Sequence, residues 1–332
     1  KKQYESVLAA AAVADLQECT TMDGHRIQVF ANIGRPHEAQ EVPQRHLDGV
    51  GLFRTEFMFM DAQEPPDLAH QERVYCEVAQ TMAGRPLVIR TVDLGGDKMP
   101  AFLSAQCRAE VTVCPRGLRF ALVVVRDLFQ VQLQAILRAS AKYHNISVLF
   151  PMVIGSYELG QAIELLRAAA GNRPMPSIGA MIETPASLFD LDAILEMVDF
   201  LSIGTNDLTQ YMLASDRNAV DLFNETTTLH PAVLRAIAQV AEAANRWNKP
   251  LAVCGEAAGD PSTACLLVGL GVRQLSMSAV RVARVRYALH SRTLSDMRQL
   301  AQNALHTNTP TKVRQLLTDL ETAGTPWPSL QA

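Results

Sequence analysis

The sequence lacks the features that mark several classes of protein. No apolar run approaches the length that a membrane-spanning helix needs, and no signal peptide opens the chain. The basic residues are dispersed, without the aromatic-interleaved basic face that is typical of nucleic-acid binding. The six cysteines form neither a CxxC pair nor a dense disulfide spacing, which indicates a reducing compartment. We therefore expect a cytoplasmic protein that binds neither membrane nor nucleic acid.

What remains is the composition of an ordinary globular protein with a large core. Of its 332 residues 48% are hydrophobic and 19% are charged, and the net charge is -4. The length slightly exceeds that of a usual (β/α)8 barrel, so it fits one such domain with extra helices, or two smaller domains. The first residue is Lys, and the opening segment is rich in Ala and has apolar residues at helical spacing. We therefore expect the chain to be a fragment of a longer one.

Eight short apolar runs without helical spacing predict buried β-strands. They occupy residues 27–33, 49–53, 87–91, 147–153, 177–182, 199–204, 251–253 and 274–277. Helical segments alternate with these runs, which predicts an α/β fold, a (β/α)8 TIM barrel with flanking helices and an active site at the carboxyl ends of its strands. A doubly wound open sheet is the alternative. It would gather functional residues at one crevice, whereas polar clusters here follow strands two, three, five, six and seven.

The remaining segments are assigned around this barrel. Residues 1–22 are expected to form a helical linker from a missing N-terminal portion, and residues 23–332 the barrel with its C-terminal helices. Residues 99–120 are expected to be irregular and to precede a long amphipathic helix at 128–143. The segment from 282 to about 323 is expected to be helical.

The sixth run leads into the densest group of polar residues. Thr205, Asn206 and Asp207 follow the strand on an expected tight turn, a helix is expected from Leu208, and Arg217 lies beyond it. A carboxylate, an amide and a guanidinium this close together suit an anionic substrate held with a hard cation. The alternative is structural, with Asn206 or Asp207 capping the helix.

Arginines recur at the predicted strand ends. Lone arginines usually lie on the surface, but Arg90 stands inside an apolar run, where an unpaired guanidinium would be costly to desolvate. Several arginines at one barrel mouth indicate a ligand with both phosphate and carboxylate groups, which arginine pairs with bidentately. The candidates for this anion clamp are Arg54, Arg90, Arg116 or Arg119, and Arg217.

Two carboxylates and one thiol complete the candidate site. Glu183 and Asp207 end adjacent strands and could share Mg²⁺, which usually takes only one or two protein carboxylates. Alternatively, both cap helices. Cys254 follows an apolar strand and precedes a glycine, so its thiol should point into the barrel mouth and act either as a nucleophile or in proton transfer.

Motifs along nearly the whole chain resemble the phosphoenolpyruvate-binding domain of enzyme I of the bacterial sugar phosphotransferase system. The matching stretches include GVGLFRTEFMFMD (49–61), IRTVDLGGDK (89–98), RGLR (116–119), GAMIETPAS (179–187), DFLSIGTNDLTQYMLASDR (199–217) and CGEAAGDP (254–261). They occur in the same order as in that family. Pyruvate phosphate dikinase and phosphoenolpyruvate synthase have a related domain, but LGGDK and CGEAAGDP resemble enzyme I more closely.

The resemblance implies a role for each matched residue. Phosphoenolpyruvate would be bound by Arg54, Arg90, Arg116, Asn206 and Arg217, Mg²⁺ would be held by Glu183 and Asp207, and Cys254 would protonate the enolate of pyruvate. The phosphoryl group would pass to a histidine on a separate N-terminal domain and then to the histidine-containing phosphocarrier protein of sugar uptake. The resemblance also implies a homodimer.

One motif departs from the family, and one other function stays possible. The family usually has Asn-Pro, then Gly and an aromatic residue, before its arginine, whereas this chain has Val-Thr-Val-Cys-Pro at 111–115. Sequence alone therefore leaves open whether Arg116 or Arg119 is the ligand; we favour Arg116 because Gly-Leu-Arg follows it. The other function is a regulatory module that binds phosphoenolpyruvate without turning it over. The presence of Glu183, Asp207 and Cys254 argues against it, because anion binding alone needs neither metal nor thiol.

Overall fold

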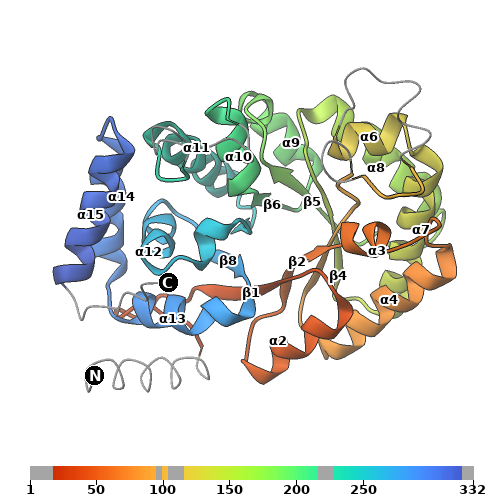
Figure 1. Cartoon of the computed structure of the whole chain (residues 1–332), viewed down its shortest axis with the longest axis horizontal. Coiled ribbons are helices and arrows are strands. Elements are labelled where there is room, and N and C mark those ends of the chain that lie inside the picture. Colours follow the sequence, from red (N-terminus) through yellow and green to blue (C-terminus); the bar gives the residue numbers. More distant parts are fainter. Residues whose placement is uncertain (1–17, 95–98, 104–115, 216–226, 324–332) are drawn as a thin grey trace.

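Eight parallel strands close into a single barrel, as the sequence predicts (Figure 1). The computed structural model describes residues 18–94, 99–103, 116–215 and 227–323. The strands are β1 (Gln28–Ile33), β2 (Val50–Arg54), β3 (Leu87–Arg90), β4 (Ile146–Phe150), β5 (Ser177–Ile182), β6 (Phe200–Ile203), β7 (Leu251–Val253) and β8 (Gln274–Met277). Each strand pairs with the next one, and β8 pairs with β1, from Gln28 opposite Gln274 to Ala31 opposite Met277. The fold is therefore a (β/α)8 barrel, and the open-sheet alternative is wrong.

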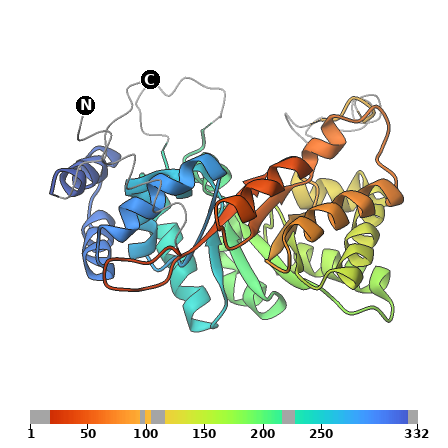
Figure 2. The ribbon, with the colours of Figure 1, turned by 90° about the horizontal axis from the view of Figure 1, so that it is seen from below.

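Helices surround the barrel and alternate with its strands. The α-helices are α2 (Glu41–Gln44), α3 (Glu56–Met60), α4 (Leu68–Thr81), α6 (Gly117–Val123), α7 (Arg126–Lys142), α8 (Ser156–Ala170), α9 (Leu191–Met197), α10 (Thr205–Met212), α11 (Pro231–Arg246), α12 (Pro261–Gly269), α13 (Val282–His290), α14 (Leu294–Leu305) and α15 (Pro310–Ala323). Short 3-10 helices are η1 (Pro36–Gln40), η2 (Ala186–Phe189), η3 (Glu256–Gly259) and η4 (Ala279–Arg281). Helices α14 and α15 lie at the opposite end of the molecule from α4 and α7 (Figures 1 and 2).

Two helices illustrate how the sequence produces these elements. Helix α11 starts with a proline after His230, whose ring accepts a hydrogen bond from the Ala232 N–H at 3.1 Å, and it buries Val233, Ile237 and Val240 at helical spacing. Helix α12 is apolar on nearly all sides. Both faces of α12 are buried, which allows this composition. One face packs against the barrel core, and Leu266 on the other packs in a second apolar cluster with residues of α14.

Three expectations about local structure are corrected or lie outside the described residues. The segment expected to be irregular at 99–120 contains the start of α6 at Gly117. Helix α10 begins at Thr205, three residues before the expected start, so Asn206 and Asp207 lie in its first turn rather than on a turn before it. The helical linker expected at 1–22 falls mostly on residues outside the described part.

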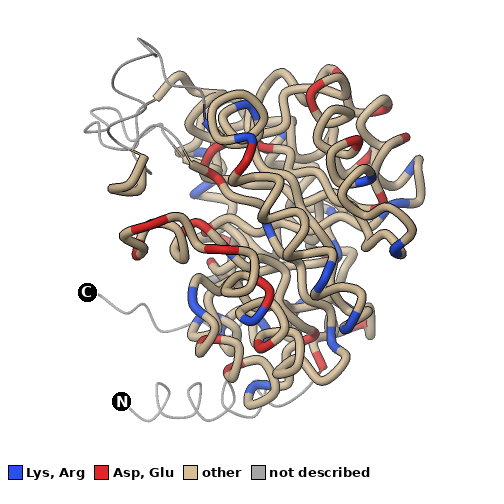
Figure 3. The backbone as a smooth tube through the Cα atoms, turned by 90° about the vertical axis from the view of Figure 1, so that its right-hand side faces the viewer, with Lys and Arg blue, Asp and Glu red and all other residues tan. Residues whose placement is uncertain are grey.

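Acidic and basic residues both occur along much of the described backbone, seen from the side in Figure 3. They do not alternate: only acidic charges occur from Glu56 to Glu72, and only basic ones from Arg273 to Arg292. Among the described residues, no single helix is long and apolar enough to cross a membrane. Only the bent pair of α6 and α7, which meet at 107°, reaches that length and composition when the two are taken together.

Candidate active site at the carboxyl face of the barrel

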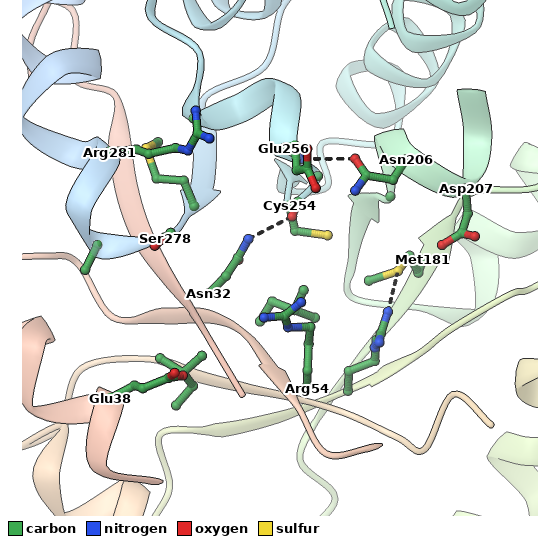
Figure 4. A pocket seen from close by; sticks show the side chains of 18 of the residues that line it. Asn32, Glu38, Arg54, Met181, Asn206, Asp207, Cys254, Glu256, Ser278 and Arg281 are labelled. Carbon is green, nitrogen blue, oxygen red and sulfur yellow. Dashed lines mark hydrogen bonds between the residues drawn. The ribbon is translucent and has the colours of Figure 1, made fainter. Parts of the chain in front are cut away.

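A cavity of about 720 Å³ opens where the strands end (Figure 4). Its floor is formed in part by Leu52, Met181 and Cys254, which belong to a small apolar cluster separate from the main core. Six residues predicted for the site line this cavity, namely Arg54, Arg90, Glu183, Asn206, Asp207 and Cys254. Arg116 reaches it indirectly, through Asp207, and Arg217 lies outside the described residues. The structure therefore brings together residues from β2, β3 and the segments that follow β5, β6 and β7.

Arg90 is the most deeply buried of the arginines in the cavity. Only 5% of its surface is exposed, and its guanidinium bonds to Glu56 and lies 3.5 Å from Asp93. Burial alone would lower the pKa of Arg90, but the carboxylates of Glu56 and Asp93 outweigh it and raise the pKa. Arg90 is thus the buried, paired cation that its place in an apolar strand required.

Arg54 differs from Arg90 because none of the described carboxylates pairs with it. Its guanidinium carbon lies 5.0 Å from the centroid of the Phe57 ring, a cation–π contact, and within the described part of the chain it forms no ion pair. Its buried Nε has no hydrogen-bond partner there, and neither has the Nε of Arg90. Buried donors of this kind are rare in folded proteins, and they indicate a missing acceptor such as an anionic ligand.

Arg116 bridges two carboxylates, which lie on adjacent edges of its guanidinium and share Nη2. Its Nη1 donates to Asp207 Oδ1 at 2.8 Å, and its Nε and Nη2 donate to the two oxygens of Asp93 at 3.2 and 3.0 Å. The following residue, Gly117, has φ +61°, and a Cβ there would lie 2.3 Å from Met152 Cβ. Only glycine allows this close approach, which places Arg116 beside the barrel mouth.

The neighbouring Arg119 points elsewhere. Its side chain is 54% exposed, and it lies 3.5 Å from Glu158 on α8. Of the two arginines that the sequence left as alternatives, the structure places Arg116 next to the cavity.

Glu183 and Asp207 are buried carboxylates on neighbouring strand ends. Glu183 is 1% exposed and Asp207 5% exposed, and Glu183 Oε1 accepts a hydrogen bond from the Met152 N–H at 2.7 Å. Burial, followed by the charges of Asp207 and Asp93, raises the pKa of Glu183 to about 8. Neither side chain caps a helix: the N-cap of α10 is Gly204, that of η2 is Pro185, and neither helix has a side-chain cap bond.

This pair has the chemistry that a hard cation requires. Its oxygens face a polar cavity, and their crowded negative charge would be relieved by a divalent cation. Within the described residues, no group of three or more His, Cys, Asp or Glu could hold a metal. The described residues thus offer no cage made of protein ligands alone, and the pair agrees with the one or two carboxylates that Mg²⁺ usually takes. The residues present therefore fit Mg²⁺.

The thiol of Cys254 lies on the cavity floor and is mostly buried. It is 6% exposed, and its Sγ lies 3.6 Å from the carbonyl oxygen of Ile203. Burial, together with the charge of Glu183, raises the pKa of Cys254 to about 11, while the neighbouring Ser202 hydroxyl and the charges of Arg90 and Arg54 act to lower it. The sulfur is therefore protonated at neutral pH, which suits a proton donor better than a thiolate nucleophile.

Two asparagines hold the backbone on either side of this thiol. Asn32 Nδ2 donates to the carbonyl oxygen of Cys254 at 2.8 Å, and Asn206 Oδ1 accepts from the Glu256 N–H at 3.1 Å. Figure 4 shows both contacts, with Cys254 between them. Asn206 thus orients the segment after β7 in addition to lining the cavity.

Sequence reasoning missed the carboxylates that pair with the arginines. Glu56 and Asp93 belong to the polar clusters that follow strands two and three, and both are buried and bound to guanidinium groups. Asp93 is three residues after Arg90, and a carboxylate this close to a buried arginine is the signal that could have identified it.

Comparison with known proteins identifies the family of this chain. Residues 9–294 match the model of the PEP-binding domain of PEP-utilising enzymes, where PEP is phosphoenolpyruvate. A phosphoenolpyruvate-protein phosphotransferase of Haloferax volcanii is 40% identical over 93% of this chain and 57% of its own length. A multiphosphoryl transfer protein of Xanthomonas campestris is also 40% identical, over 89% of this chain and 35% of its own length. The chain thus spans about half, or less, of the relatives it matches.

A solved structure supports the fold independently of sequence. A citrate lyase from Burkholderia xenovorans superposes with a TM-score of 0.52 at 14% identity, covering 89% of this chain and 91% of that one. At this identity the likeness concerns the barrel alone. With the family match over most of its length, the chain belongs to the PEP-utilising enzymes and contains their PEP-binding domain.

Proposed function

We propose that this chain is the phosphoenolpyruvate-binding barrel of a phosphoenolpyruvate-protein phosphotransferase. The observation that carries the proposal is the content of one cavity: two arginines whose Nε donors find no acceptor among the described residues, a pair of buried carboxylates and a protonated thiol. Its relatives carry the names phosphoenolpyruvate-protein phosphotransferase and multiphosphoryl transfer protein. The cavity offers the groups that phosphoryl transfer from phosphoenolpyruvate would need, because a phosphate, a carboxylate and a developing enolate each need a different partner.

The arginines and Asn206 would bind the substrate. Arg54 and Arg90 face the cavity, Arg116 stands beside it, and Arg217 is assigned to the substrate by its motif alone. Guanidinium groups pair bidentately with phosphate and carboxylate oxygens and neutralise the charge that spreads over the transferring phosphoryl group.

Glu183 and Asp207 would hold Mg²⁺. When bound, the ion would neutralise negative charge on the phosphate and on the enolate oxygen as the phosphorus–oxygen bond breaks. The chain's own contribution is to fix both carboxylates at adjacent strand ends, with Glu183 held by the Met152 N–H.

Cys254 would deliver the proton that converts enolate into pyruvate. The thiol proton would go to the methylene carbon, and the sulfur would regain a proton from solvent. A buried thiol with a pKa near 11 keeps this proton at neutral pH until a carbanion-like carbon stands beside it.

The phosphoryl acceptor would lie on another part of the whole protein. All eight histidines fall among the described residues, and none of them lines the cavity. We therefore propose that the acceptor is a histidine on a separate N-terminal domain, which passes the group to the histidine-containing phosphocarrier protein of sugar uptake. A cytoplasmic homodimer, as the family resemblance implies, is part of the same proposal.

The test follows transfer of the phosphoryl group from phosphoenolpyruvate to the separately expressed N-terminal portion. The chain is incubated with Mg²⁺ and phosphoenolpyruvate labelled in its phosphate, with and without the separately expressed N-terminal portion of the full-length protein. We expect the chain to stay unlabelled and the N-terminal portion to become labelled only when the chain is present. Acid-labile label on the chain itself would place the acceptor here instead. Tight binding without any labelling would favour a regulatory module.

A further inference from the structure

The carboxylate proposed to bind metal is already paired in the structure. Both oxygens of Asp207 accept hydrogen bonds from Arg116, from Nη1 at 2.8 Å and from Nη2 at 3.3 Å. The Arg116 side chain is only 11% exposed, so water does not weaken this pair as it would at the surface. A divalent cation and Arg116 therefore require the same two oxygen atoms.

Asp93 holds the other edge of the same guanidinium. Asp93 is fully buried, and it accepts from Arg116 Nε at 3.2 Å and from Nη2 at 3.0 Å. It also lies 3.5 Å from Arg90, the other buried arginine. Because these contacts use the Nε edge of Arg116, they can persist while Nη1 leaves Asp207.

We propose that Arg116 occupies the metal-binding carboxylate Asp207 when no ligand is bound, and that Asp93 is a positioning residue that keeps Arg116 at the site when a cation takes Asp207. This inference rests on the proposed function, in which Glu183 and Asp207 hold the cation. Arg116 would then have two partners in turn, Asp207 in the empty site and the phosphate of the substrate in the filled one. The guanidinium of Arg116 would rotate while it keeps its hydrogen bonds to Asp93, and it would thereby exchange Asp207 for the phosphate.

The consequence is coupling between the two ligands. Phosphate that draws Arg116 away frees Asp207 for the cation, and a cation on Asp207 frees Arg116 for the phosphate. By linkage each ligand must raise the affinity of the other by the same factor. In the absence of substrate, Arg116 thus lowers the affinity for the metal. When substrate is present, Arg116 binds its phosphate and raises the affinity for the substrate.

Binding of Mn²⁺ to the chain without substrate, followed by electron paramagnetic resonance of the free ion, tests the competition directly. In Arg116→Gln the competing cation is gone, so we expect Mn²⁺ to bind at least about tenfold more tightly than to the wild type. The matched control is Arg119→Gln, whose arginine pairs with Glu158 away from the cavity and should leave Mn²⁺ affinity unchanged. Equal Mn²⁺ affinity in Arg116→Gln and the wild type would overturn the inference.

Two further variants separate the bridge from simple charge. Arg116→Lys keeps the charge but cannot fork to both carboxylates, so it should also bind Mn²⁺ more tightly than the wild type. In Asp93→Asn, Arg116 loses its other anion and stays with Asp207, so Mn²⁺ should bind more weakly. Wild-type affinity in Arg116→Lys would reduce the effect to net charge and overturn the bridge. Wild-type affinity in Asp93→Asn would overturn the role of Asp93.

Adding phosphoenolpyruvate distinguishes failure of this inference from failure of the proposed function. We expect the substrate to raise the Mn²⁺ affinity of the wild type more than that of Arg116→Gln. If the wild type binds no phosphoenolpyruvate at any Mn²⁺ concentration, the proposed function itself is wrong. If it binds phosphoenolpyruvate but Arg116→Gln shows the same coupling, only the exchange of partners by Arg116 is wrong.

Discussion

The barrel mouth has a paired half and an open half. In the paired half, Arg90 and Arg116 are engaged by the carboxylates Glu56, Asp93 and Asp207. The open half consists of Arg54, which has no ion pair in the described part of the chain, and Cys254, whose Sγ lies 3.6 Å from the carbonyl oxygen of Ile203.

The two halves show two roles that a buried polar group can have, one in stabilising the fold and one in binding a ligand. A paired arginine contributes to the folded state and must exchange partners before it can bind a ligand. An unpaired group contributes little to folding and is ready for the ligand at once. Substitutions in the two halves should therefore differ in whether they affect stability, binding or chemistry.

The largest effect is expected in the open half, at Cys254. Cys254→Ser should retain folding and phosphoenolpyruvate binding but lose about 10²- to 10⁴-fold in the exchange of solvent protons into the methyl group of pyruvate, the range for general acid–base groups. Nuclear magnetic resonance of pyruvate in deuterated water, with Mg²⁺, measures this exchange. A variant that melts far earlier yet still exchanges at the wild-type rate would make the thiol part of the core packing instead.

In the paired half, Arg90→Ala should reduce both stability and binding. It leaves Glu56 and Asp93 buried beside a missing cation, and breaking a buried pair in this way costs about 3–5 kcal/mol. Urea unfolding and calorimetric titration with phosphoenolpyruvate measure the two losses. The double variant Arg90→Met with Glu56→Gln should recover part of the stability and none of the binding. Unchanged affinity in Arg90→Ala would remove this residue from the substrate site.

Arg54→Ala should separate binding from stability most clearly. Phosphoenolpyruvate affinity should fall about tenfold to a hundredfold, the loss of one charge-assisted contact of about 1.5–3 kcal/mol. The urea midpoint should stay the same or rise slightly, because the variant also removes a buried Nε that has no hydrogen-bond partner among the described residues. A midpoint lowered as much as in Arg90→Ala would contradict the division into two halves.

A surface pair provides the smallest effect and isolates the influence of burial. Glu72 on α4 accepts from Lys142 on α7 at 2.7 Å, and this hydrogen bond holds the pKa of Glu72 below its ordinary value of 4.5. Its contribution to stability is therefore present above that value and is lost as the pH falls through the lower, folded pKa.

Glu72→Gln should accordingly lower the thermal midpoint only slightly at pH 7 and should match the wild type in acid. Scanning calorimetry at both pH values measures this. Lys142 is exposed, so water and salt screen the pair. An effect as large as that of Arg90→Ala would show that burial is not what distinguishes the buried pairs at the barrel mouth.

The sequence predicted the barrel well because the relevant signal is local. Each strand is a short apolar run, and each run predicted a strand that the structure contains. The position of Arg90 inside such a run also indicated a buried cation before its partners were known. The same reasoning gathered six of the predicted site residues at one mouth, since strand ends of a parallel barrel share one face.

What the sequence could not predict depends on contacts between distant segments. The bridge from Asp93 through Arg116 to Asp207 joins residues 23 and 91 positions apart, and it exists only because Gly117 fits against Met152. The start of α10 at Thr205 was missed because Asn206 and Asp207 favour turns and caps, and tertiary packing overrode that preference.

The barrel closes only when β8 pairs with β1. Gln28 and Gln274 are paired although 246 positions separate them, so one side of β1 has no partner until the last strand has been synthesised. A nascent chain on the ribosome therefore exposes an unpaired strand edge while the residues between β1 and β8 are synthesised, and such edges attract other chains. Nonsense mutations upstream of the codon for Gln274 should consequently yield aggregating products rather than smaller folded barrels, so we expect this fold to depend on chaperones that shield nascent chains.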